Sequence, residues 1–167
     1  MVGKTLPAEP AEPPVLVQRR GRLASLVLNR PRVLNALNLE MIRLLRGALE
    51  DARADAQVRL LVLSGAGERG FCAGGDLKEF SQAVKSGGLP WADEFFREEF
   101  DLDLLIHQYP KPVVALADGI TMGGGLGLAA AADLVAATER SRSQNFPHGF
   151  LPPPVSCQPT IQSEIMR

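Results

Sequence analysis

The sequence has few cysteines, no strong excess of charge and no long apolar run. Cys72 and Cys157 can form at most one disulfide, which excludes a disulfide-stabilised scaffold and favours a reducing, cytoplasmic setting. The net charge of −1 gives no electrostatic basis for binding nucleic acid or an anionic membrane, so neither partner is expected. Apolar runs such as 126–132 are far shorter than the roughly 20 residues of a transmembrane helix, and none is predicted.

What the sequence does contain is an alternation of short apolar runs and helical patterns. Apolar residues at helical spacing follow Asn38, a favourable N-cap, and predict a helix that runs to about Ala56. Continuous apolar runs, typical of strands buried on both faces, occur at 58–63 and 112–116. Further strands are expected at 15–18, 23–28 and 134–137, and further helices at 77–84, 91–107 and 126–132. This order predicts an α/β domain with crossover helices.

The two ends of the chain differ in composition from its centre. Residues 1–14 are rich in proline, alanine and glutamate and lack the pattern of a signal or transit peptide, so we expect a disordered tail. From Ser143 onward proline is frequent and no helical or strand periodicity survives. Residues 143–167 are therefore expected to form an irregular tail. The predicted core is 15–142.

Glycine clusters follow two of the predicted strands. Segment 65–70 matches the G-x-G-x-x-G pattern of dinucleotide sites, but it opens no helix and lacks the acidic residue expected about 20 positions on. Segments 73–76 and 123–125 each precede a predicted helix, where backbone N–H groups could stabilise a negative oxygen. Two tight strand-to-helix turns explain the same glycines, and glycine content alone favours that simpler interpretation.

Three short motifs occur in order along the core. They are Asn29-Arg30-Pro31 with Leu34-Asn35-Ala36-Leu37, Phe71-Cys72-Ala73-Gly74-Gly75-Asp76-Leu77, and Asp118-Gly119 followed by Met122-Gly123-Gly124-Gly125. Together they resemble the signatures of the crotonase superfamily, which implies a spiral of β-β-α units. The Gly74-Gly75 pair and segments 95–100, 109–112 and 122–128 look most like 3-hydroxyisobutyryl-CoA hydrolases. This resemblance implies an acyl-CoA substrate, thioester hydrolysis in valine catabolism and a possible homo-oligomer.

The resemblance also assigns roles to individual residues. It implies that the amides of Gly75 and Gly124 form an oxyanion hole and that Glu99 lines the substrate pocket. Other residues would lie along the adenine and pantetheine channel or near the CoA phosphates, namely Ala73, Asp76, Leu77 and Lys78. Without the resemblance, Glu99 would be interpreted as a solvated helix residue and Asp76 as a stabilising acid at a helix N-terminus. No metal ion and no separate cofactor are expected, because CoA is part of the substrate.

The sequence departs from the family pattern at two places. Hydratases of the superfamily carry a glutamate two residues after the glycine triplet, where this chain has Gly127, which argues against water addition. The hydrolases take their acid from a later segment, and Pro147 or His148 stands at that position here. We therefore predict a truncated domain that binds CoA thioesters better than it hydrolyses them. The alternatives are an enoyl-CoA hydratase or isomerase and a non-catalytic acyl-CoA-binding fragment.

Overall fold

The computed structural model describes residues 12–86 and 89–144 of the 167-residue chain. The elements in chain order are β1 (Val15–Arg20), β2 (Leu23–Leu28), η1 (Pro31–Val33), α1 (Leu39–Ala54), β3 (Leu60–Gly65), β4 (Gly70–Cys72), α2 (Leu77–Lys85), α3 (Leu89–His107), β5 (Val113–Ala117), β6 (Ile120–Met122), α4 (Gly124–Ala131), β7 (Leu134–Ala137) and β8 (Arg142–Gln144). This mixture of strands and crossover helices confirms the predicted α/β class.

The strands form two sheets. The larger has the order β1-β2-β3-β5-β7, in which β1 and β2 form an antiparallel hairpin and the remaining neighbours are parallel. The smaller sheet, β4-β6-β8, is parallel throughout. Each of β3, β5 and β7 is followed directly by one strand of the smaller sheet, and helices return the chain after β4 and β6. This repetition is the expected spiral of β-β-α units.

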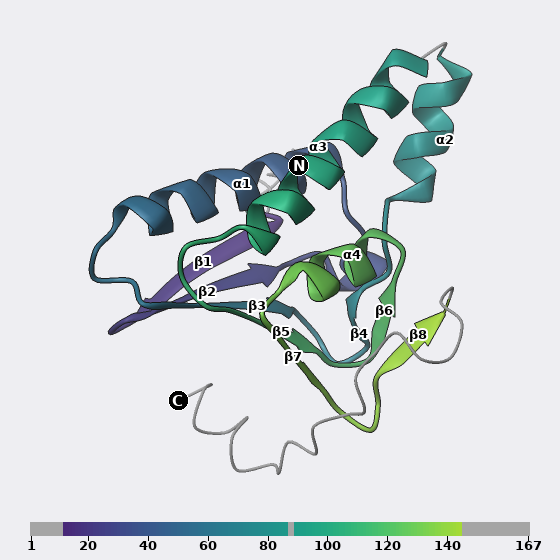
Figure 1. Ribbon diagram of the computed structural model, residues 1–167. Helices are drawn as coiled ribbons and strands as arrows, with labels where there is room; N and C mark the ends of the chain where they lie inside the picture. Colours follow the sequence, from purple (N-terminus) through teal and green to yellow (C-terminus); the bar gives the residue numbers. More distant parts are fainter. Residues whose placement is uncertain (1–11, 87–88, 145–167) are drawn as a thin grey trace, which may run out of the picture.

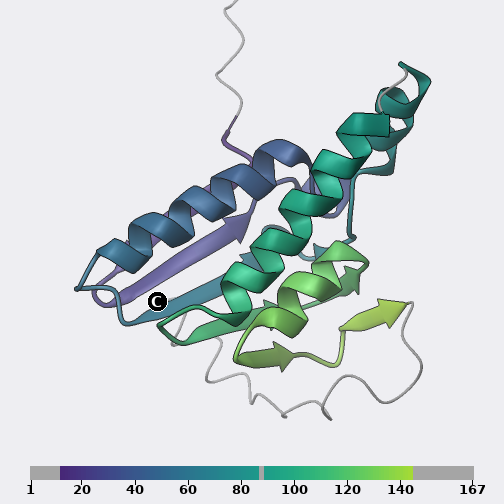
Figure 2. The ribbon, with the colours of Figure 1, turned by 45° about the horizontal axis from the view of Figure 1, so that its top comes forward.

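Helices α1, α3 and α4 lie side by side over one face of the larger sheet, and α2 and the outer half of α3 extend beyond its edge (Figures 1 and 2). The first helix illustrates why. Asn38 Oδ1 accepts a hydrogen bond of 3.0 Å from the Met41 N–H, which caps the helix at the predicted residue. Its apolar side, including Ile42, Leu45 and Leu49, is fully buried against the sheet and α3.

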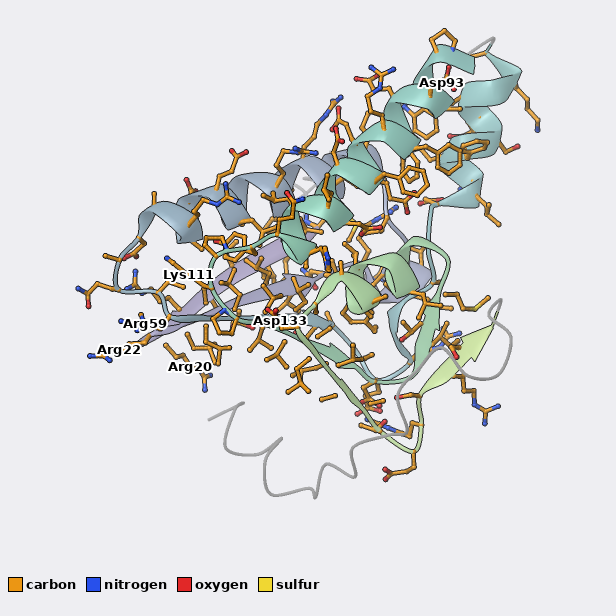
Figure 3. All side chains as sticks on the ribbon, in the orientation of Figure 1. Arg20, Arg22, Arg59, Asp93, Lys111 and Asp133 are labelled. Carbon is orange, nitrogen blue, oxygen red and sulfur yellow. The ribbon has the colours of Figure 1, made fainter. Side chains whose placement is uncertain are left out.

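Three arginines and a lysine lie at the end of the sheet opposite the glycine loops (Figure 3). Figure 3 shows Arg20, Arg22 and Arg59 at the hairpin end of the sheet, while Asp93 lies near the outer tip of α3. Lys111 Nζ donates hydrogen bonds to the carbonyl oxygens of Ala52 and Asp55, the latter at 2.7 Å. These bonds satisfy carbonyl groups at the C-terminus of α1, where a cation is also favoured by the helix dipole.

Some element boundaries differ from the prediction. The structure adds three strands that the sequence did not indicate, β4, β6 and β8, each only three residues long. The prediction that irregular structure begins at Ser143 was wrong by two residues, because Ser143 and Gln144 pair with Thr121 and Met122 of β6. The remainder of the predicted tail, residues 145–167, lies outside the described residues, as do residues 1–11. No helix among the described residues is long and apolar enough to cross a membrane.

Candidate functional site

The buried asparagine of the first motif holds the loops around the site together. Asn35 has a left-handed backbone conformation (φ 55°) and is fully buried. Its side-chain N–H groups donate to the carbonyl oxygens of Ala66 (3.0 Å) and Gly70 (2.9 Å), and its Oδ1 accepts from the Arg30 N–H (2.9 Å). The motif thus fixes the loop between β3 and β4, which runs into β4 and not into a helix. This arrangement contradicts a dinucleotide-binding role for 65–70.

The second glycine segment is anchored to the residue that ends the first motif. Leu37 N–H donates to Gly74 O at 2.7 Å, and Asp76 N–H donates to Leu37 O at 2.8 Å, so Leu37 forms a parallel bridge with Gly75. The Gly75 N–H lies between these two bonds and donates to no acceptor among the described residues. A free amide at this position is what an oxyanion site requires.

The two glycine clusters pack directly against each other. Gly74 has φ 91°, and a methyl group built on it would lie 2.9 Å from Met122 O and 3.3 Å from the Gly124 nitrogen. Only glycine therefore fits here. Helix α4 begins at Gly124, after Gly123 at φ 50°, so the Gly124 N–H is a first-turn amide without an intrahelical acceptor. The structure brings the two loops together, while their use as one oxyanion hole stays a prediction.

Helix α3 presents three side chains, four residues apart, to three glycines. A methyl group on Gly75 would lie 3.4 Å from the Phe95 ring. One on Gly124 would overlap Glu99 Oε1, and one on Gly127 would lie 2.5 Å from Asp103 Oδ2. Residues at this spacing share one helix face, and the absence of side chains on the glycines lets that face approach α4 closely (Figures 1 and 2).

Of the two carboxyl groups on this face, Glu99 is buried and Asp103 is half-buried. Glu99 is only 6% exposed, which contradicts the interpretation of this residue as a solvated helix position. Burial raises the pKa of Glu99, and burial together with the charge of Glu99 raises the pKa of Asp103 to about 7. Asp103 Oδ1 is buried and has no hydrogen-bond partner among the described residues. The arrangement can therefore hold a proton close to neutral pH.

Asp103 is the site residue that the sequence reasoning missed. Its signal was available, because it lies four residues after Glu99 on a helix whose adjacent positions Leu102 and Ile106 are buried. A carboxylate at such a position faces the interior, whereas the exposed Asp101 faces solvent.

Asp76 has a clear structural function. Its Oδ1 accepts hydrogen bonds from the N–H groups of Lys78 (3.1 Å) and Glu79 (3.3 Å) at the start of α2, and its Oδ2 pairs with Arg30 at 2.8 Å. Burial would raise the pKa of Asp76, but the Arg30 pair and these amides lower it overall. The carboxylate thus caps α2 and ties it to the first motif.

The other predicted channel residues surround this cap. Ala73 N–H donates to Leu34 O at 3.0 Å, so its backbone is fixed against the first motif. Leu77 is 82% exposed and the Lys78 side chain is also exposed. An exposed leucine and lysine beside the glycine loops are compatible with contact to a large ligand, and their binding role stays a prediction.

Comparison with known proteins identifies relatives of this chain. Residues 23–145 match the family model described as enoyl-CoA hydratase/isomerase. The mitochondrial 3-hydroxyisobutyryl-CoA hydrolase of Rattus norvegicus is 47% identical over 127 residues, which are 76% of this chain and 33% of that protein. The human protein of the same name is 43% identical over 126 residues, covering 75% and 32% respectively. The chain thus spans about a third of the length of the curated relatives it matches.

Solved structures give the same result. A carnitinyl-CoA dehydratase from Mycobacterium thermoresistibile superposes with a TM-score of 0.76 and 38% identity, covering 79% of this chain and 38% of that one. An enoyl-CoA hydratase from Rhodobacter sphaeroides gives a TM-score of 0.75 and 36% identity, covering 78% and 39%. With its motifs, its spiral of β-β-α units and the match over 23–145, the chain belongs to the enoyl-CoA hydratase/isomerase family.

Proposed function

We propose that this chain binds CoA thioesters through the glycine loops and that the thioesters it hydrolyses are of the 3-hydroxyisobutyryl-CoA type. Binding should exceed turnover, because neither Pro147 nor His148 supplies a carboxyl group at the position where the hydrolases carry their acid. One observation carries the proposal. The buried carboxyl group of Glu99 lies against Gly124 at the start of α4, next to the loop that holds Gly75. The relatives named as 3-hydroxyisobutyryl-CoA hydrolases, at 47% and 43% identity, support this choice of substrate class.

The amides of Gly75 and Gly124 would bind the thioester carbonyl oxygen. Negative charge develops on that oxygen when the carbonyl carbon is attacked, and two prearranged N–H donors stabilise it without reorganisation. The N-terminus of α4 adds the positive end of a helix dipole at the same place. Removing one such donor from an enzyme typically slows the reaction about 10²–10³-fold.

Glu99 is the acidic group that lies against Gly124. Because it is buried against Gly124 and has a raised pKa, it can exchange a proton with a water molecule or a leaving group at the thioester. The side chain would also fix the orientation of a hydroxyl group on a short acyl chain. Ala73, Asp76, Leu77 and Lys78 would flank the CoA moiety, and no separate cofactor is needed.

The remaining proposals concern the setting of the protein. The names of the curated relatives include the word mitochondrial, and a cytoplasmic location for this chain stays a proposal that cell fractionation can test. A homo-oligomer is likewise proposed, and sedimentation of the purified chain measures it.

The test separates binding from turnover. The purified chain is mixed with 3-hydroxyisobutyryl-CoA and, in a parallel sample, with a 2-enoyl-CoA. Calorimetry measures binding of each ligand. A thiol reagent measures release of CoA, and absorbance measures loss of the enoyl group. Binding of both ligands with release of thiol from the first alone supports the hydrolase. Loss of the enoyl group favours the hydratase alternative, and binding without reaction favours the non-catalytic fragment. Failure to bind either ligand contradicts the proposal.

A further inference from the structure

Two carboxyl groups stand against neighbouring turns of α4 from a single helix. A methyl group on Gly124 would overlap Glu99 Oε1, and one on Gly127 would lie 2.5 Å from Asp103 Oδ2, so the two carboxyl groups lie against positions three residues apart on one face of α4. The carboxyl groups come from positions four apart on α3, which also share a face. Both helices therefore bring the two groups into one narrow space between α3 and α4.

We propose that Glu99 and Asp103 form a carboxyl pair that holds one proton, in which Asp103 keeps the proton and Glu99 carries the charge. Asp103 is then a positioning residue, because it acts on the substrate through Glu99. This inference rests on the proposed function for its catalytic consequence and on geometry for the pair itself.

Among residues 12–86 and 89–144, no cation pairs with either group. Neither Glu99 nor Asp103 forms an ion pair or hydrogen bond with any described residue, and α4 carries no titratable side chain. On α1, Arg43 pairs with Glu94 and Glu98, and Arg46 donates to the Glu98 carbonyl oxygen. Two carboxylates, one buried and one half-buried, without a positive partner repel each other, which favours retention of one proton.

The other described elements next to the pair also contribute no ion pair to it. Lys78, Glu79 and Lys85 of α2 form no ion pair with α3 among the described residues. On β4, Cys72 lies against the same part of α4, and its thiol stays neutral because burial raises its pKa to about 12. On α3 itself, Arg97 and Asp101 are exposed.

The order of ionisation follows from the surroundings of the carboxyl oxygens: Asp103 Oδ1 is fully enclosed without a hydrogen-bond partner among the described residues, and the same is true of neither Glu99 oxygen. Burial raises the pKa of Glu99, whereas burial and then the charge of Glu99 raise the pKa of Asp103 to about 7. Glu99 therefore loses its proton first, and its charge acts on Asp103. The titrations described below test this order.

In the proposed hydrolysis, the pair allows one proton to move at a time. Glu99 removes a proton from water as the water oxygen bonds to the thioester carbonyl carbon, and the carbonyl oxygen becomes negative. The C–S bond then breaks, and the proton passes from Glu99 to the CoA sulfur, giving the acid and the free thiol. Asp103 keeps its proton throughout. Ionised Asp103 would place a second negative charge near the developing oxyanion and oppose the reaction.

The first experiment measures ionisation directly. Carbon-13 NMR of side-chain carboxyl groups follows each titration in the full chain, with assignments from Glu99→Gln and Asp103→Asn. We expect Asp103 to titrate near pH 7, and its midpoint to fall by about one pH unit or more in Glu99→Gln. Asp103→Asn should leave the Glu99 midpoint close to the wild-type value, because Asp103 is neutral when Glu99 titrates. Asp101→Asn, the exposed control, should change neither.

These titrations test whether Glu99 and Asp103 form the proposed carboxyl pair, whether or not the chain is active. An Asp103 midpoint below pH 5 in the wild-type chain, or one that Glu99→Gln does not move, overturns it. If Asp103→Asn shifts the Glu99 midpoint as much as Glu99→Gln shifts the Asp103 midpoint, the assignment of the shared proton to Asp103 is wrong.

The second experiment tests the role in hydrolysis. Thiol release from 3-hydroxyisobutyryl-CoA should show an alkaline limb with a midpoint near pH 7, with the rate falling about tenfold per pH unit above it. Asp103→Asn should remove this limb, whereas Asp101→Asn should retain it. A limb that persists in Asp103→Asn overturns the positioning role. An absence of turnover in all variants, with the titrations as expected, counts against the proposed function and leaves the pair intact.

Discussion

Replacing Asp103 by asparagine should make the folded chain more stable at pH 8. The raised pKa of about 7, compared with an ordinary value of 3.8, means that the folded state binds this proton more tightly than the unfolded state. The contribution of the protonated Asp103 carboxyl group to the stability of the folded state is fully present below pH 3.8, decreases as the pH rises, and is lost above pH 7. An asparagine side chain at this position would be neutral at every pH and would escape this loss.

The structure sets the size of the effect. A difference of about 3 pH units corresponds to about 4 kcal/mol at 1.36 kcal/mol per unit, and partial solvent access of Asp103 reduces this to about 2–4 kcal/mol. Between pH 5 and 8 the wild-type free energy of unfolding should decrease relative to that of Asp103→Asn. The carboxylates whose pKa values are lowered, such as Asp76 and Glu98, have the opposite effect on stability, but only at more acidic pH.

Urea denaturation at pH 5, 6, 7 and 8 provides the assay. Trp91 is the only tryptophan and stacks on Phe95 with ring centroids 5.5 Å apart, so its fluorescence reports loss of packing around α3. Asp101→Asn, at an exposed position of the same helix, is the control and should follow the wild type at every pH. The reasoning is refuted if Asp103→Asn is no more stable than the wild type at pH 8, or if the difference between them does not grow with pH.

Three further predictions concern packing and the loops. Gly124→Ala should weaken thioester binding at least about tenfold in calorimetry, because the new methyl group overlaps Glu99 Oε1. Gly47→Ala is the control, since its methyl group meets nothing within 4 Å. It should leave binding unchanged and stabilise the chain by about 0.5–1 kcal/mol. Asp76→Ala should cost about 1–2 kcal/mol in urea denaturation by removing the cap of α2, and an unchanged midpoint would contradict that role. Leu45→Ala should cost about 2–5 kcal/mol by creating a cavity under α1; a loss below about 1 kcal/mol would show that this packing is loose.

The longer elements could be predicted from sequence because each carries its own periodic signal. The capped helix after Asn38 and the apolar strand around Leu61–Leu63 are local patterns, and the structure has them within two residues of the predicted boundaries. The three-residue strands of the smaller sheet carry no such signal. They are strands only because distant segments pair with them, as Ser143 pairs with Thr121.

The site could be predicted only in part, for a related reason. The glycines of both loops stand out in the sequence, and the resemblance assigned them a role together with Glu99. Asp103 differs from the exposed Asp101 only in which side of α3 it faces, and its environment depends on Gly127 of another helix. A contact of this kind depends on how two helices pack, which the local sequence around Asp103 does not contain.

The smaller sheet has a consequence for how the chain folds. Its three strands, β4, β6 and β8, are separated by long stretches of sequence, so none can pair until the intervening chain has been brought together by the larger sheet and its helices. Loops 73–76 and 123–124 directly follow two of these strands. These loops should therefore be set in place late in folding, and their local unfolding should cost less free energy than unfolding of the core under α1. In native-state hydrogen exchange, the amides around Gly75 and Gly124 should exchange before those of Leu45 and Leu49.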